Sequence, residues 1–328
     1  RQGDAWQVLG FWVKERAVSY DEVRSRIKGL VLNVPTPFHP ETYEVDYAGL
    51  RANVERWCAA GVRTLLLTYG TSEYYALSES EIAEVTRATV RAASGRALVV
   101  ACAGRWWLGQ TVEFARFCER EGADALMVVK LDAQEFLTPK NVDALVQWHE
   151  ALQVRTRIPL VYHSWFEGPG TVEAIKRVCA LEHVVGLKQE FANCMQYIEI
   201  AEAMKGRTAL ICGGGPPLGY WAYQFGWDAA LTGVGQWNPG VELEGHAAIL
   251  SGDLNAGKAY VDRIMPYRRA AARIGNHPCI KAAMDFAGYA GGPVRPPQRN
   301  LTEDEKERLR QAIRESELGD LSTRYPRG

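Results

Sequence analysis

Short apolar runs, each followed by a helical pattern, repeat eight times between residues 29 and 251 and constrain the fold more than any other feature. The runs are rich in Val, Leu, Ile and Ala, which is typical of strands that are buried on both faces of a parallel sheet. Repeated strand–helix units with short links predict right-handed crossovers. Eight such units at this length fit a closed barrel. We therefore expect an α/β fold, a (β/α)8 TIM barrel.

Strands are expected at 29–34, 64–67, 97–101, 125–129, 158–162, 184–188, 209–212 and 229–232. Helices are expected at about 46–60, 78–93, 111–121, 138–152, 171–179, 193–204, 218–225 and 241–251. Ser78 or Ser80 is expected to cap one helix start, with a Glu three residues later for a capping box. A doubly wound open sheet is the alternative, but no Gly-x-Gly-x-x-Gly turn follows the first strand.

The chain divides into three parts by composition. We expect an N-terminal extension with a short amphipathic helix (1–28), the barrel (29–251) and a C-terminal helical domain (252–328). The last part carries helical patterns near 255–274, 277–287 and 302–316, with an extended proline-rich strap at 291–297.

Charge and cysteine usage exclude several function classes. The 328 residues carry a net charge of −1, so there is no excess of positive charge of the kind that binds nucleic acid or an anionic membrane. The 7 cysteines show neither Cys-x-x-Cys spacing nor a histidine cluster, so no zinc site or disulfide framework is predicted. No apolar run approaches the ~18–20 residues of a membrane span, and no secretory signal is evident. We expect a cytoplasmic protein that needs neither metal nor organic cofactor.

Two neighbouring strands end in reactive side chains, Tyr162 and Lys188. Sites in parallel α/β proteins form at the carboxyl ends of the strands, so both side chains are expected to project into one cavity. Apolar walls would lower the pKa of the lysine and make its amine a nucleophile for a ketone. A strand-end lysine that reaches solvent is the alternative. Lys130 also ends a predicted strand, but Asp132 follows it closely.

Further candidates follow other strands. The loop of Gly70, Thr71 and Ser72 offers small residues, backbone N–H groups and two hydroxyls, which could form an anion cradle for a carboxylate or a plain turn. His163 is the histidine best placed for acid–base work. Glycines at 213–215 could form a phosphate loop, although the P-loop ending is missing.

These motifs together resemble the dihydrodipicolinate synthase / N-acetylneuraminate lyase family of Schiff-base (class I) aldolases and dehydratases. The resemblance covers about residues 28–316 and rests on the order and spacing of five segments: 35–38, 70–78, 161–162, 185–188 and 292–297, with Gly213 after the seventh strand. It implies a barrel with a C-terminal helical domain, usually a tetramer or dimer. It also implies that Lys188 forms an imine with a 2-keto acid, that Tyr162 relays protons, and that Thr71 with its neighbouring backbone binds the carboxylate.

The chain departs from the synthase of this family in two places. Lys130-Leu131-Asp132 stands where the synthase has a Pro-Tyr-Tyr segment that reaches the neighbouring subunit. Glu167 stands where the synthase has an arginine for the second substrate's carboxylate, which a glutamate would repel. The tail around 280–297 looks closer to the branch that dehydrates keto-deoxy sugar acids.

We therefore expect a lyase that acts on a small-molecule 2-keto acid, either as a 2-keto-3-deoxy sugar acid dehydratase or as a pyruvate-releasing aldolase. The expected catalytic residues are Lys188, Tyr162 and Thr71, and the expected substrate-binding residues are Gly70, Thr71, Ser72, His163, Glu167, Gly213 and Thr232. Synthase-type condensation of pyruvate and a non-catalytic keto-acid-binding barrel are the alternatives. A homo-oligomer is expected, and the sequence leaves its size and the substrate open.

Overall fold

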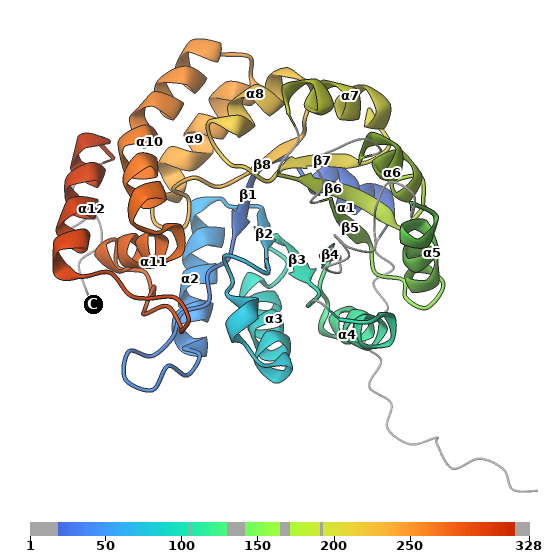
Figure 1. The fold of residues 1–328 in the computed structure, drawn as a ribbon, viewed down its shortest axis with the longest axis horizontal. Coiled ribbons are helices and arrows are strands. Elements are labelled where there is room, and N and C mark those ends of the chain that lie inside the picture. Colours follow the sequence, from blue (N-terminus) through green and yellow to red (C-terminus); the bar gives the residue numbers. More distant parts are fainter. Residues whose placement is uncertain (1–18, 105, 130–141, 165–170, 191–192, 319–328) are drawn as a thin grey trace, which may run out of the picture.

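The computed structural model describes residues 19–104, 106–129, 142–164, 171–190 and 193–318, and eight parallel strands within them close into a barrel (Figure 1). The strands are β1 (Gly29–Asn33), β2 (Thr64–Leu66), β3 (Leu98–Cys102), β4 (Ala125–Val129), β5 (Leu160–Ser164), β6 (Val184–Gln189), β7 (Ala209–Cys212) and β8 (Ala229–Leu231). Each strand pairs with its neighbour in sequence, and β8 pairs with β1. The predicted TIM barrel is confirmed.

A ring of helices surrounds the strands (Figure 1). The helices of the repeat are α2 (Tyr47–Ala60), α3 (Glu79–Ala93), α4 (Leu108–Glu121), α5 (Val142–Gln153), α6 (Thr171–Val178), α7 (Cys194–Met204), α8 (Leu218–Gln224) and α9 (Pro239–Leu250). Of the two serines expected as the cap of α3, Ser78 is the N-cap and forms a capping box with Glu81. Left-handed Gly61 and Gly122 end α2 and α4, because glycine adopts positive φ without strain.

The amino-terminal end of the barrel is covered by α1 (Tyr20–Arg26). Ile27 is buried beside Gly186 of β6, and the Tyr20 hydroxyl donates to the carbonyl of Arg157, just before β5. A cavity of about 1170 Å³ opens between α1 and the residues that precede β5 and β6. Because sites in this fold form at the opposite, carboxyl end of the strands, this cavity is not the candidate site.

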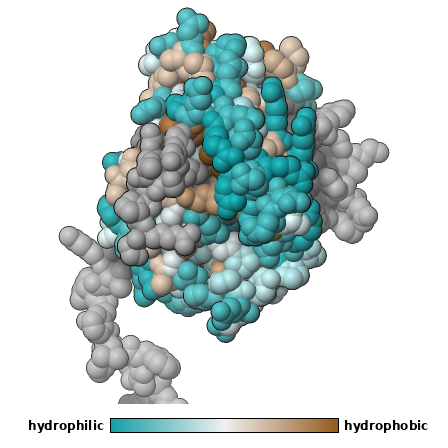
Figure 2. All heavy atoms as spheres, turned by 90° about the vertical axis from the view of Figure 1, so that its left-hand side faces the viewer, coloured by the Kyte–Doolittle hydropathy of each residue, from teal (hydrophilic) through white to brown (hydrophobic). Residues whose placement is uncertain are grey.

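Three helices follow the barrel: α10 (Leu254–Ile274), α11 (Asn276–Phe286) and α12 (Glu303–Glu315). The face that they form is largely hydrophilic (Figure 2). On α12 the buried residues include Leu309 and Ile313, while most of its charged residues face solvent. Within the described residues, none of the helices combines the length and the hydrophobicity that a membrane crossing requires.

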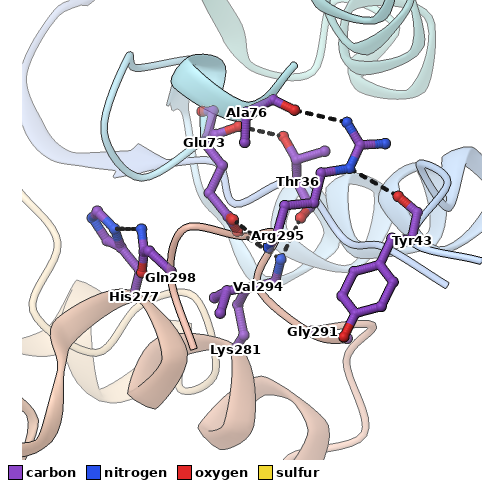
Figure 3. A network of polar contacts seen from close by, with 12 residues as sticks. Thr36, Tyr43, Glu73, Ala76, His277, Lys281, Gly291, Val294, Arg295 and Gln298 are labelled. Carbon is purple, nitrogen blue, oxygen red and sulfur yellow. Dashed lines mark hydrogen bonds and ion pairs between the residues drawn. The ribbon is translucent and has the colours of Figure 1, made fainter. Parts of the chain in front are cut away.

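The C-terminal segment is fastened to the carboxyl end of the barrel by two cations (Figure 3). The Lys281 ammonium of α11 donates to the carbonyl of Thr36 at 2.8 Å and to the Glu73 carboxylate at 2.7 Å. Arg295 of the strap pairs with Glu81 at 2.7 Å and donates to the carbonyls of Tyr43 and Ala76, each at 2.8 Å. These contacts fix the loops that follow β1 and β2, which border the candidate site.

Candidate active site at the carboxyl ends of the strands

Lys188 is the last but one residue of β6 and only 2% exposed. Burial lowers the pKa of its ammonium group to about 7, since a charged amine loses water in the barrel interior. The side chain therefore does not extend into solvent. Burial thus favours the neutral amine, which is the state that attacks a ketone.

His163 lies beside Lys188, because the register of β5 and β6 places the two residues opposite each other. The distance from His163 Nε2 to Lys188 Nζ is 3.0 Å. His163 is 3% exposed, and burial, followed by the positive charge of Lys188, lowers its pKa well below the usual range. The imidazole is therefore neutral at neutral pH and can accept a proton from a group at the lysine nitrogen.

Tyr162 lies on the other face of β5, and the expectation that it shares a cavity with Lys188 is wrong. Its ring packs edge-on against His149 of α5, with 5.2 Å between the ring centroids, so the side chain points to the helix layer. Side chains alternate between the two faces of a strand, so the consecutive residues Tyr162 and His163 point to opposite sides. Only one of them can face the barrel interior. Burial raises the pKa of Tyr162, so the phenol stays protonated.

Glu190 completes the group around Lys188 and was not predicted. Its carboxylate forms an ion pair with the lysine ammonium, and its Oε1 lies 3.5 Å from His163 Nε2. A Cβ atom at Gly213 would overlap the Glu190 side chain, so the glycine predicted after the seventh strand leaves room for it. The signal in the sequence was the spacing, since residues two apart on a strand share a face.

The loop after β2 is a tightly bonded turn and not a cradle of free N–H groups. The amides of residues 71, 72, 73 and 74 donate to Thr68 Oγ1, Thr68 O, Gly70 O and Tyr69 O. Ser72 is 0% exposed, and its hydroxyl donates to Val34 O at 2.5 Å and accepts from Thr68 N at 3.0 Å. The hydroxyl of Ser72 therefore holds the turn within the fold, and a contact of Ser72 with the substrate stays a prediction.

Thr71 differs from Ser72, since it is partly exposed and its hydroxyl keeps a hydrogen to donate. Asn33 Nδ2 donates to Thr71 Oγ1 at 2.6 Å, and Gln236 Nε2 donates to Asn33 Oδ1 at 2.9 Å. This chain of amides fixes the position of the threonine oxygen. Gly70 is partly exposed and lies near the His277 ring of α11, which a Cβ atom would meet at 3.9 Å.

Of the remaining residues named from the sequence, the structure describes Thr232 but not Glu167 or Lys130. Thr232 follows β8 and accepts a hydrogen bond from the amide of Gly235 at 2.6 Å, so part of its hydroxyl capacity holds a turn. Glu167 and Lys130 lie outside the described residues. Within the described ranges, no group of three or more His, Cys, Asp or Glu side chains is arranged to bind a metal ion.

Comparison with protein families matches residues 26–316 to the model of the "Dihydrodipicolinate synthetase family". Among curated relatives, a probable 5-dehydro-4-deoxyglucarate dehydratase 2 of Streptomyces avermitilis is 31% identical over 86% of this chain and 85% of its own. A probable 5-dehydro-4-deoxyglucarate dehydratase of Rhizobium meliloti is 25% identical, covering 91% and 99%. A 4-hydroxy-tetrahydrodipicolinate synthase of Methanopyrus kandleri is 24% identical, covering 88% and 96%.

Solved structures support the fold. The dihydrodipicolinate synthase of Oceanobacillus iheyensis superposes with a TM-score of 0.83 over 92% of this chain and 100% of its own, at 22% identity.

Proposed function

Because this chain belongs to the dihydrodipicolinate synthetase family and is a lyase, we propose that Lys188 forms an imine with the ketone of a 2-keto acid. The observation that carries the proposal is the burial of Lys188, which lowers its pKa to about 7 and supplies a neutral amine. The nitrogen adds to C2, the ketone oxygen becomes a hydroxyl and then leaves as water, and a C=N bond remains.

His163 moves protons during this step in our proposal. Its Nε2 is 3.0 Å from Lys188 Nζ, within direct reach of a proton on the attacking nitrogen. A neutral imidazole can take that proton and return it to the departing oxygen. His163 thus takes the part that we expected from Tyr162.

Thr71 is proposed to bind the carboxylate of the keto acid. Its hydroxyl oxygen is fixed by Asn33 at 2.6 Å, and its hydrogen remains free to donate to an anion. The loop that carries Thr71 and the strand that carries Lys188 meet the same end of the barrel.

The proposed substrate is a 2-keto-3-deoxy sugar acid, from which the enzyme removes water. The names of the two dehydratase relatives support this class over synthase-type condensation. Glu167 and the segment Lys130-Leu131-Asp132, where the synthase has an arginine and a Pro-Tyr-Tyr segment, support it as well. A glutamate can accept hydrogen bonds from the hydroxyls of a sugar acid.

Borohydride reduction in the presence of pyruvate tests imine formation. The peptide that contains Lys188 should gain the mass of the reduced keto acid, and Lys188→Met should not be labelled. Labelling of another lysine would contradict the assignment, and no labelling would favour a protein that only binds keto acids. A panel of 2-keto-3-deoxy acids and aspartate semialdehyde, assayed for water loss, pyruvate release and condensation, then identifies the reaction.

A further inference from the structure

Glu190 contacts the nitrogen of Lys188 that is proposed to form the imine. The steps proposed above for imine formation do not use its carboxylate. Its Oε1 accepts from Lys188 Nζ and lies 3.5 Å from His163 Nε2. Its side chain is 20% exposed, whereas that of Lys188 is 2% exposed. The carboxylate is therefore more accessible to solvent than the nitrogen that it contacts.

Two features hold Glu190 in this position. Its amide donates to Gln189 Oε1 at 2.8 Å, which anchors the backbone just after β6. Gly213 of the neighbouring strand end lies directly against the Glu190 side chain, and any Cβ atom there would overlap Glu190 Cγ. The ordinary φ of Gly213 means that space, and not backbone conformation, calls for glycine at this position.

We propose that Glu190 is the base that removes the C3 proton of the imine and the acid that returns this proton to the C4 hydroxyl. This inference rests on the proposed function. C3 lies two bonds from the imine nitrogen, so a carboxylate oxygen in contact with Lys188 Nζ is within reach of a C3 proton. His163 lies deeper, at 3% exposure, where it faces the nitrogen and the departing ketone oxygen.

The step balances without a further reactant. When the C3–H bond breaks, its electron pair forms C2=C3, the C2=N pair moves to nitrogen, and Glu190 gains the proton. The nitrogen pair then reforms C2=N, the C2=C3 pair forms C3=C4, and the C4–O bond breaks toward oxygen. The oxygen takes the proton from Glu190 and leaves as water. Because one carboxylate serves both atoms, hydrogen and hydroxyl leave from the same face of the substrate.

Pyruvate separates this step from imine formation. Its methyl carbon occupies the position of C3, so exchange of its protons for deuterium in D₂O, followed by NMR, reports proton removal alone. Borohydride trapping of the same variant reports the imine. Glu190→Gln should keep trapping at Lys188 and lose exchange by about 10²–10⁴-fold. Glu190→Asp, which keeps a carboxylate, should retain more exchange than Glu190→Gln, and Glu173→Gln on the exposed face of α6 serves as the control.

The outcomes distinguish the two proposals. No trapping in the wild type overturns the proposed function itself. Trapping with normal exchange in Glu190→Gln overturns only the role of Glu190. Loss of trapping in Glu190→Gln also overturns it, because Glu190 would then serve imine formation. If His163→Gln keeps trapping but loses exchange, His163 and not Glu190 is the C3 base.

Gly213→Ala provides a second test that leaves the carboxylate in the chain. The added methyl group should displace Glu190, so exchange should fall at least tenfold while trapping persists. In the Glu190→Ala background the three side-chain atoms that lie nearest to this methyl group are absent, so the further loss should be less than threefold. An equal loss in both backgrounds would contradict the proposed contact.

Discussion

The buried ion pair of Lys281 and Glu73 allows a quantitative test of how the C-terminal helices hold the active-site end of the barrel. The two side chains are 2% and 0% exposed and meet at 2.7 Å, across 208 positions of sequence. Lys281→Met removes the positive charge and the hydrogen bond to Thr36 O. Glu73 then remains as a buried charge.

Removal of one partner from a buried ion pair costs about 3–5 kcal/mol. Glu73 Oε2 keeps a hydrogen bond from the Arg295 amide at 3.1 Å, so we expect a loss near the lower end, about 3 kcal/mol. Burial lowers the pKa of Lys281 to about 8, although the attraction of Glu73 raises it. The cost of desolvating the lysine charge is therefore larger than the gain from its ion pair. Removal of both charges in Lys281→Met/Glu73→Gln should therefore cost less than either single change, about 1 kcal/mol.

Urea unfolding followed by tryptophan fluorescence measures these free energies. Lys258→Met is the matched control, because Lys258 pairs with Asp262 on the exposed surface of α10 and should cost less than about 1 kcal/mol. Equal losses for Lys281→Met and Lys258→Met would refute the reasoning. It would also fail if the double variant lost the sum of the two single changes, since additive losses mean no coupling.

Three further predictions concern the lysine site. The rate of pyruvate trapping at Lys188 should rise with pH and level off above about 7, since burial lowers the pKa to that value and the amine attacks; a rise that continues toward pH 10 would indicate a solvated lysine. His163→Gln should lower kcat by about 10²–10⁴-fold, and a near-normal rate in a steady-state assay would exclude the histidine as the proton carrier. Tyr162→Phe should change kcat less than about tenfold, because its ring packs against His149 of α5; a larger loss in the same assay would return the tyrosine to the mechanism.

Local patterns were sufficient to predict the barrel. Both ends of strand β7 (Ala209–Cys212) were predicted correctly, because a short apolar run bounded by turn signals is typical of a buried strand. The start of α3 followed from the side chains of Ser78 and Glu81, which satisfy backbone groups of their own turn. Lys188 was singled out because a polar residue at the end of a buried strand is unusual, and the structure places it near the end of β6 with 2% exposure.

The choice between Tyr162 and His163 depended on information that no local pattern holds. The register of β5 and β6 shifts between Leu160 and Val161, so that His163 and not Ser164 pairs with Lys188. The side of the strand that faces the interior is set by such pairing with a neighbour. The hydrogen bond of the Ser72 hydroxyl could not be predicted for a similar reason, since its acceptor is Val34, 38 positions earlier.

The two halves of the proposed site are held by different kinds of interaction. Lys188 and His163 are fixed by strand register, which cannot change without moving every side chain of the strand. Thr71 lies in a loop whose position depends on Glu73, and Glu73 is held by Lys281 and by the Arg295 amide from the C-terminal segment. A keto acid bound through its carboxylate and its ketone would connect these halves. The proposed reactive nitrogen therefore belongs to the barrel alone, whereas the proposed contact of Thr71 with the carboxylate requires the C-terminal helices to be in place.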